Sequence, residues 1–153
     1  MKDGGIKTKI VKRYIPKFNK IVNKYLSAMN LYVNFTIDEN FNEKILSRYK
    51  SNFSYSNFSE GEKFRIDLAI LFAWREIAQE RNSVSTNLLV MDEIFDSSLD
   101  SEGTDDFIKI MFNDLTKGTN LFVISHKSDQ LVDKFEQVIE FEKVKGFTKI
   151  KET

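Results

Sequence analysis

Asp92 and Glu93 are adjacent acids that directly follow the apolar residues 88–91, an arrangement that could carry chemistry. A short, continuously apolar stretch predicts a parallel strand with both faces buried. Such a strand brings its last side chains to the carboxyl edge of the sheet, where ligands bind in α/β folds. There Asp92 is placed to bind Mg²⁺, which prefers carboxylate and phosphate oxygens, and Glu93 to orient or deprotonate an attacking water molecule. The alternative is a strand that ends in a solvated acidic turn.

His126 is the only histidine of the chain, and it follows a second apolar stretch, residues 121–124, and Ser125. That stretch predicts another buried strand. A lone histidine is most often a surface or core residue with satisfied hydrogen bonds. Its position after the strand that follows Glu93 in the chain makes His126 a candidate site residue.

Residues 59–62 open a predicted helix and allow two interpretations. Ser59 with Glu62 three residues later is the pattern of a capping box, which is common at helix starts. A helix N-terminus also presents free N–H groups and the positive end of the helix dipole, which together suit a phosphate. Gly61 would let the backbone approach closely, and the Ser59 hydroxyl could donate a hydrogen bond. Because a carboxylate repels phosphate, we expect Glu60 to point away.

Residues 92–106 are acidic throughout and contain no basic residue. The seven acids are Asp92, Glu93, Asp96, Asp100, Glu102, Asp105 and Asp106. Asp100 or Ser101 could cap a following helix. A two-metal nuclease built on these acids is a rival interpretation, although such sites usually gather ligands from separated segments and often include histidine.

Hydrophobic periodicity predicts the elements that position these residues. Apolar residues recur at helical spacing at Ile6, Ile10, Tyr14, Phe18, Ile21, Tyr25 and Met29. Pro16 should kink this helix or mark a helix start. Alternating apolar and polar residues predict a strand over 31–37 and one or two strands over 43–57, broken near Ser51 and Asn52.

Strands and helices alternate along the rest of the chain, which favours an α/β layer plan. The sequence predicts helices over 60–80, 101–117 and 128–135, and Gly118 ends the second of them. It predicts strands over 88–91 and 121–124. It also predicts a hairpin in which 138–143 pairs with 147–150 and the chain turns at Gly146.

Length and composition indicate one folded, cytoplasmic domain. The chain has 153 residues, 14 Phe and a hydrophobic fraction of 41%, which suit one sizeable core. It has no Cys, so neither a disulfide framework nor a thiolate metal site is expected. No apolar run approaches the ~18 residues of a membrane span, and basic residues interrupt any signal-peptide pattern.

Charge is distributed unevenly although the net charge is zero. Residues 1–30 carry eight Lys and Arg against the single acid Asp3, a net +7, so the remainder carries −7. Such asymmetry can mark a surface that binds nucleic acid. The alternative is a solvated helix surface.

Four segments, read in chain order, resemble the motifs of an ABC-type ATPase. Residues 58–62 resemble the signature motif, 88–93 the Walker B strand, 97–100 the D-loop and 124–126 the switch histidine. The family most often has two glycines in the signature, and Glu60 replaces the first. The phosphate-binding loop would need Gly-x-x-x-x-Gly-Lys, and none of the six glycines is followed by Lys.

The closest resemblance is to the C-terminal lobe of SbcC-type break-repair ATPases of the structural-maintenance-of-chromosomes (SMC) superfamily, and among them to the large subunits of phage recombination endonucleases. Residues 5–7, 14–16, Asn19 and 23–26 resemble the stretch where the returning coiled coil of that family enters the lobe. Residues 95–100, followed by residues 124–126, fit this branch better than chromosome condensins, which often lack the histidine.

This resemblance implies a domain plan and site roles. Residues 1–30 would be a coiled-coil root and residues 31–153 the C-terminal ATPase lobe, with parallel strands flanked by helices and a C-terminal hairpin. The cofactors would be ATP and Mg²⁺. The implied roles are catalysis by Glu93 and His126, metal binding by Asp92, and nucleotide binding, partly across a dimer interface, by Ser59, Gly61, Glu62 and Asp100.

The resemblance also implies partners. These are an N-terminal lobe with the Walker A loop, a second ATPase head, a metallophosphoesterase nuclease subunit and DNA. No membrane partner is expected. If the chain is phage-encoded, the location would be the bacterial cytoplasm. ATP-driven head closure would regulate the access of the nuclease to DNA during double-strand-break repair. Alternatives are another chromosome-maintenance or recombination ATPase head, or a non-catalytic module that binds DNA or a protein partner.

We expect the chain alone to hydrolyse ATP negligibly, because its sequence supplies no Gly-x-x-x-x-Gly-Lys loop to hold the phosphates. Phosphate release by the purified chain, measured with and without Mg²⁺, tests this expectation. Robust Mg²⁺-dependent turnover by a verified pure sample would contradict it.

Overall fold

The computed structural model describes residues 4–47, 50–81, 86–96, 99, 101–115, 118–127 and 131–151. Its helices and strands are α1 (Gly4–Ala28), β1 (Val33–Ile37), β2 (Glu43–Ser47), β3 (Lys50–Phe53), α2 (Glu60–Arg81), β4 (Leu88–Asp92), α3 (Ser101–Ile110), β5 (Asn120–Ile124), β6 (Phe141–Val144) and β7 (Phe147–Ile150). Short 3-10 turns η1 (Tyr55–Asn57), η2 (Ile94–Asp96) and η4 (Val132–Lys134) and the π-helix η3 (Met111–Leu115) lie between them.

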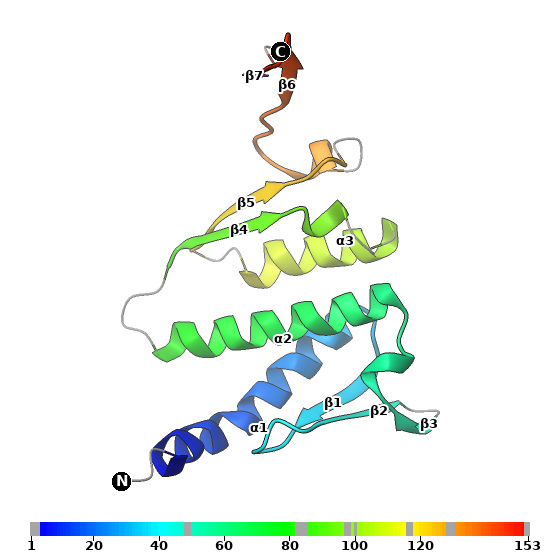
Figure 1. The fold of residues 1–153 in the computed structure, drawn as a ribbon, viewed down its shortest axis with the longest axis vertical. Coiled ribbons are helices and arrows are strands. Elements are labelled where there is room, and N and C mark those ends of the chain that lie inside the picture. Colours follow the sequence, from blue (N-terminus) through cyan, green and yellow to red (C-terminus); the bar gives the residue numbers. More distant parts are fainter. Residues whose placement is uncertain are drawn as a thin grey trace.

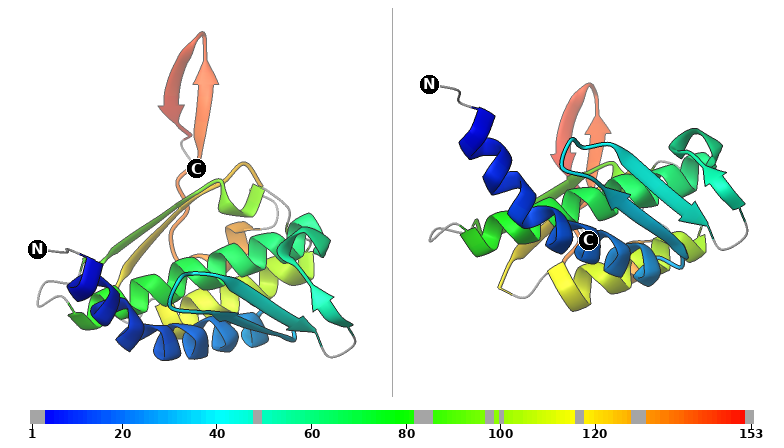
Figure 2. Two further views of the ribbon diagram at one scale, coloured as in Figure 1. Left: turned by 60° about the horizontal axis from the view of Figure 1, so that its bottom comes forward. Right: turned by 90° about the horizontal axis from the view of Figure 1, so that it is seen from below.

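The elements are stacked along the long axis of the molecule (Figure 1). At one end α1 packs beside α2 and the antiparallel sheet β1-β2-β3. The parallel pair β4-β5 lies beyond α2 and α3, and the β6-β7 hairpin projects from the far end, as Figure 1 and the left view of Figure 2 show. No helix in the described part of the chain is long and apolar enough to cross a membrane.

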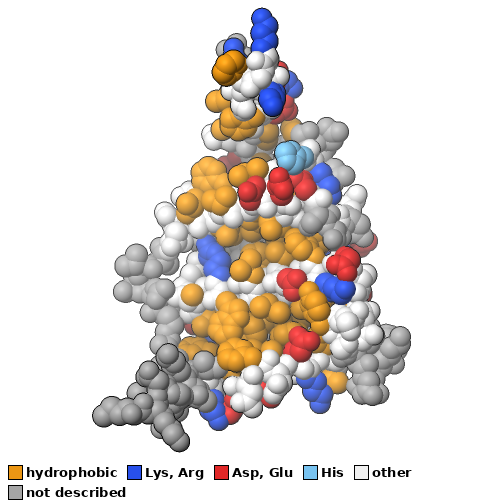
Figure 3. All heavy atoms as spheres, viewed as in Figure 1, with side chains coloured by type: hydrophobic (Ala, Val, Ile, Leu, Met, Phe, Trp, Pro, Cys, Tyr) orange, Lys and Arg blue, Asp and Glu red, His pale blue; other side chains and the backbone are white. Residues whose placement is uncertain are grey.

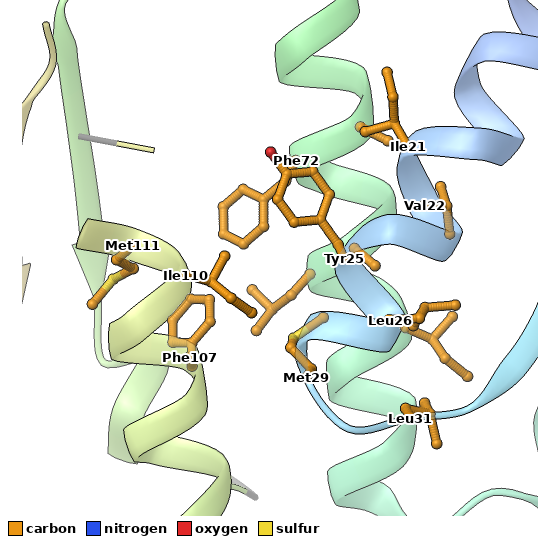
Figure 4. Packing of buried hydrophobic residues seen from close by; sticks show 14 of the residues in the cluster. Ile21, Val22, Tyr25, Leu26, Met29, Leu31, Phe72, Phe107, Ile110 and Met111 are labelled. Atoms are coloured by element: carbon orange, nitrogen blue, oxygen red, sulfur yellow. The ribbon is translucent and has the colours of Figure 1, made fainter. Parts of the chain in front are cut away.

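One hydrophobic core joins the three helices. Figure 4 shows apolar side chains of α1, α2 and α3 that converge between the helices. The Phe72 ring on α2 lies 5.8 Å from the Phe107 ring on α3, and the Phe95 ring, just after β4, lies 5.3 Å from the Phe107 ring. All three side chains are fully buried. Phe107 therefore links the helical core to the end of β4.

Several predicted boundaries differ from the structure. Helix α1 runs through Pro16 rather than beginning there. Residues 43–57 contain two strands, as one of the two predicted alternatives has it, but β2 ends at Ser47 and β3 begins at Lys50. The division therefore lies before Ser51 and Asn52, which belong to β3, where Phe53 pairs with Ile45. Residues 55–57 form η1 instead of a strand.

The predicted helix over 101–117 is an α-helix that continues as the π-helix η3 to Leu115, and residues 116–117 lie outside the described part. Gly118 has a φ of 74°, the left-handed conformation that glycine favours after a helix. Of the helix predicted over 128–135, residues 128–130 lie outside the described part, Leu131 is helical, and residues 132–134 form the 3-10 turn η4.

The C-terminal hairpin is confirmed, with a shorter first strand. Strand β6 begins at Phe141 rather than Val138, because β7 supplies pairing partners only from Phe147 to Ile150. Lys145 and Gly146 have φ values of 50° and 88°. Positive φ at both central residues is the geometry of a type I′ turn, whose twist matches that of two paired strands.

The β4-β5 pair buries one face and exposes the other. The strands pair in parallel register from Leu88 with Asn120 to Asp92 with Ile124. Side chains alternate between the two faces of a sheet. One face packs on the core with Leu89, Met91, Leu121 and Val123. The other exposes 45% of Leu88, 52% of Val90, 57% of Phe122 and 50% of Ile124. The prediction that both faces are buried is therefore wrong for this chain alone.

Two asparagines on α1 complete the hydrogen bonding of β1. Asn23 donates to the Phe35 carbonyl at 2.7 Å and accepts from the Phe35 N–H at 2.8 Å. Asn19 makes the same pair of bonds with Ile37, at 3.1 and 2.9 Å. Four helical residues advance ~6 Å and two strand residues ~6.7 Å, so the two spacings match. The asparagines thus cover the strand edge that β2 leaves open.

We expect Asn23→Ala to lower the free energy of unfolding by about 1–3 kcal/mol, because it leaves the N–H and C=O of Phe35 without their partner. Urea unfolding followed by circular dichroism measures the change. Asn34→Ala, at an exposed position of the same strand, is the control and should stay within about 0.5 kcal/mol. Equal effects of the two variants would contradict the role of Asn23.

Candidate functional site

The carboxyl ends of β4 and β5 form one edge of the sheet, and three of the predicted site residues lie there. Asp92 ends β4 and pairs in register with Ile124, the last residue of β5. Glu93 follows Asp92, and His126 lies two residues after Ile124. In Figure 3 the pale blue histidine lies beside acidic side chains, with hydrophobic side chains nearby. The parallel pairing thus brings together residues about thirty positions apart.

Glu93 has a left-handed backbone conformation, with a φ of 54°. This region is uncommon for residues other than glycine and recurs at functional sites, where surrounding bonds must hold it. The Glu93 N–H donates to the Ile124 carbonyl at 2.8 Å, and the Glu93 carbonyl accepts from the Asp96 N–H at 3.0 Å. The first bond extends the β4-β5 ladder by one residue and the second closes a tight turn.

The Glu93 carboxylate contacts the His126 ring. Glu93 Oε1 lies 3.1 Å from His126 Nε2, and the two side chains remain 62% and 81% exposed. Both groups can therefore reach a ligand from solvent. A carboxylate that accepts a proton beside an imidazole that can donate or accept one is a combination suited to acid–base chemistry on water.

Asp96 connects the two loops, and the sequence did not single it out. Its carboxylate accepts hydrogen bonds from the Ser125 hydroxyl and, at 2.9 Å, from the His126 N–H. The Ser125 hydroxyl oxygen in turn accepts from the Lys127 N–H at 3.0 Å. The bond from Ser125 holds the pKa of Asp96 below its usual value, as does the weaker contribution of the His126 N–H. In the sequence Asp96 was one of seven acids and a member of the segment 95–100 that resembles the family, with no role of its own.

The first turn of α2 forms the predicted capping box. The Ser59 N–H donates to Glu62 Oε2 at 2.8 Å, the Ser59 hydroxyl donates to the same oxygen at 2.9 Å, and the Glu62 N–H donates to Ser59 Oγ at 3.3 Å. Gly61 lies half-buried in this turn. The Glu60 carboxylate accepts from Lys63 at 2.6 Å, one turn along the helix. Ser59 and Glu62 therefore satisfy each other's hydrogen-bonding groups within this chain.

Aromatic side chains fix the segment before this turn. Phe58 is buried in the core. The Tyr55 hydroxyl donates to both carboxylate oxygens of Asp67 on α2, at 2.9 Å each. Burial and, after it, the bond to Asp67 raise the pKa of Tyr55 to about 12. The chain thus enters α2 in a fixed direction.

The structure does not bring all predicted site residues together. Ser59, Gly61 and Glu62 open α2, whereas Asp92, Glu93 and His126 follow the ends of β4 and β5. Asp100, with Ser97 and Ser98 of the predicted D-loop, lies outside the described residues. The chain therefore offers two separate groups of polar residues.

Asp92 provides a carboxylate of the kind Mg²⁺ prefers. It is exposed and, by strand alternation, lies on the sheet face that carries Val90. Within the described ranges, no group of three or more His, Asp or Glu side chains could hold a metal ion. The residues fit Mg²⁺ only if further oxygen ligands, such as nucleotide phosphates, complete the site.

The fold resembles that of SMC ATPase head structures. A structure from work on ATP-driven dimerisation and DNA-stimulated activation of SMC ATPases matches with a TM-score of 0.73 and 15% identity, over 94% of this chain and 87% of that chain. The SMC head domain from Thermotoga maritima matches with a TM-score of 0.66 and 22% identity, over 95% of this chain and 52% of that one. The predicted α/β lobe of an ATPase head is confirmed.

The chain is homologous to phage exonuclease subunit 2. It is 49% identical over 148 residues to exonuclease subunit 2 of Enterobacteria phage T4, and 48% identical over 148 residues to that of Escherichia phage RB69. Each alignment covers 97% of this chain and 26% of the relative, so the chain spans about a quarter of their length. No protein-family model matches the chain. The resemblance predicted from the motifs is confirmed.

We expect Ser59→Ala to lower the free energy of unfolding by about 0.5–2 kcal/mol, because it removes the acceptor for the Glu62 N–H and a donor to its carboxylate. Thermal and urea unfolding measure this change. The control is Ser27→Ala, an exposed serine of α1, which should change stability by less than about 0.5 kcal/mol. Wild-type stability of Ser59→Ala would show that the capping box contributes nothing.

Proposed function

We propose that this chain is the C-terminal lobe of an ATPase head in a phage exonuclease complex, and that Glu93 and His126 serve ATP hydrolysis. The observation that carries the proposal is the 3.1 Å contact of an exposed carboxylate with an exposed imidazole at the carboxyl edge of a parallel sheet. Homology to phage exonuclease subunit 2 and the SMC head fold support it.

In this proposal Glu93 acts as the base. Its carboxylate would orient the attacking water or take its proton, and His126 would contact the terminal phosphate and the same water. Asp92 would hold Mg²⁺, which neutralises developing phosphate charge when bound. The left-handed backbone at Glu93 supports this assignment, because strained residues of this kind recur where a side chain must be aimed.

A separate lobe with a Walker A loop would supply the phosphate-binding part. The exposed apolar face of β4-β5, formed by Leu88, Val90, Phe122 and Ile124, supports this. Such a contiguous apolar patch favours a protein contact. Asp92 lies on the same face, so a lobe that covered it would bring its nucleotide close to Asp92 and Glu93. The greater length of the relatives leaves room for such a lobe.

The helix start at Ser59 would act on a second head. Ser59, Gly61 and Glu62 open α2 and so belong to a different element from Glu93, and they would meet a nucleotide held by another subunit. ATP would then close two heads on two nucleotides, with Asp100 shaping the shared site. This closure would regulate the access of a partner metallophosphoesterase nuclease to DNA.

Residues 1–30 would form the root of a coiled coil that meets DNA or the nuclease, and residues 31–153 the ATPase lobe, all in the bacterial cytoplasm. The basic composition of the first segment supports a charged partner. Among the described side chains of this segment, Lys12 forms an ion pair with Glu39 and Lys17 with Glu80.

We expect Glu93→Gln to slow single-turnover ATP hydrolysis by about 10²–10⁴-fold in the complete ATPase, because the amide keeps the shape and loses the base. Nucleotide binding should remain, so ATP should accumulate on the protein and prolong its dimer, as measured by quench-flow and sedimentation. Glu136→Gln makes the same chemical change at an exposed position after η4 and should leave the rate unchanged. Hydrolysis by Glu93→Gln at the wild-type rate would rule out the assignment.

A further inference from the structure

Besides the contact between their side chains, hydrogen bonds join the loops that carry Glu93 and His126, and Asp96 makes two of those described. Another is the backbone bond from the Glu93 N–H to the Ile124 carbonyl, at 2.8 Å. Asp96 accepts from the Ser125 hydroxyl through one carboxylate oxygen and from the His126 N–H, at 2.9 Å, through the other. One carboxylate thus fixes the backbone at His126 relative to the loop that begins at Glu93.

The contact between Glu93 and His126 needs such support. Both side chains are mostly exposed, and an exposed pair of this kind contributes little to holding its own geometry. The hydrogen bonds to Asp96 form between a charged acceptor and neutral donors, and bonds of this type are stronger than neutral ones. The position of the imidazole therefore depends on Asp96 more than on Glu93.

The core anchors Asp96 itself. Its neighbour Phe95 is fully buried against Phe107 of α3, with ring centroids 5.3 Å apart. The Asp96 N–H donates to the Glu93 carbonyl at 3.0 Å. The burial of Phe95 and the hydrogen bond to the Glu93 carbonyl thus hold the Asp96 backbone in place. The Asp96 carboxylate in turn holds the loop after β5 through its two hydrogen bonds.

We propose that Asp96 is a positioning residue that holds His126 at hydrogen-bond distance from Glu93 and thereby sets the geometry for hydrolysis. This inference rests on the proposed ATPase function of Glu93 and His126. Asp96 makes no contact with the nucleotide in this role. Its effect on the reaction passes entirely through His126, and that dependence can be tested.

Substitution of Asp96 by Ala and by Asn distinguishes its positioning of His126 from an effect of its negative charge. Asp96→Ala removes both acceptors and frees the loop after Ser125. Asp96→Asn retains one oxygen to accept from the His126 N–H, and its amide can donate to the Ser125 oxygen, whose hydrogen then rotates away. The asparagine variant therefore keeps both connections, in weaker neutral form. A positioning role predicts rescue by asparagine.

The first test is single-turnover ATP hydrolysis by the complete ATPase. We expect Asp96→Ala to lower the rate by about 10–100-fold, since displacement of a catalytic group by ~1 Å can cost about 10²-fold. Asp96→Asn should stay within about threefold of wild type, and the affinity for ATP should not change in either variant. Asp106→Ala removes a carboxylate of α3 that accepts from Lys109 and Asn30, and should leave the rate unchanged.

The second test is a double substitution. If Asp96 acts only through His126, Asp96→Ala should slow hydrolysis no further in a His126→Ala background. A wild-type rate for Asp96→Ala, or the same factor of loss in both backgrounds, would overturn the proposal. Failure of the proposed function looks different, because Glu93→Gln and His126→Ala would then both hydrolyse ATP normally.

A third measurement does not depend on ATP hydrolysis and reports directly on the hydrogen bond from the His126 N–H to Asp96. Amide hydrogen exchange at His126 should be slow in the wild type and accelerate in Asp96→Ala, with asparagine in between. If Asp96→Ala does not fold, Ser125→Ala removes one of the two donors and should give a smaller loss of rate that also vanishes in the His126→Ala background. Unchanged exchange at His126 in Asp96→Ala, or, where only Ser125→Ala folds, the same loss of rate with and without His126, would overturn the proposal.

Discussion

The parallel pairing of β4 with β5 is the constraint on which the candidate site depends. Because Asp92 lies opposite Ile124, the next residues of both strands emerge at one edge, and the Glu93 N–H can continue the ladder to the Ile124 carbonyl. A shift of one residue would move every side chain of a strand to the opposite face. It would also separate Glu93 from His126. The core fixes this register through Met91 and Val123, which face the helices.

Periodicity and local motifs were enough to predict most of the fold. The helical stripe of α1, the apolar run of β4 and the alternation in β1 each reflect a local period that the sequence displays directly. The capping box at Ser59 and the turn at Gly146 were equally visible, because they depend on residues only a few positions apart. Fold class and the position of Glu93 at a strand end followed from such signals.

What could not be predicted depends on contacts between distant residues. The bonds from Ser125 and His126 to Asp96 join positions about thirty apart, and no local pattern distinguishes Asp96 from the other acids nearby. The exposed face of β4-β5 was missed for a different reason, because four apolar residues indicate a buried strand whether the covering surface belongs to the same chain or to another. The strand at Ser51 and Asn52 depends on its neighbour rather than on its own composition.

The paired bonds of Asn19 and Asn23 have a mechanical consequence. They join α1 and β1 at two points, so the helix can neither slide nor rotate against the strand without breaking four hydrogen bonds. Helix α1 and strand β1 therefore move together. A displacement of α1 near these residues would carry β1 with it and, through the contact of Tyr25 with Phe72, would act on α2. The two asparagines thus couple any motion of this part of α1 to the strand beside it.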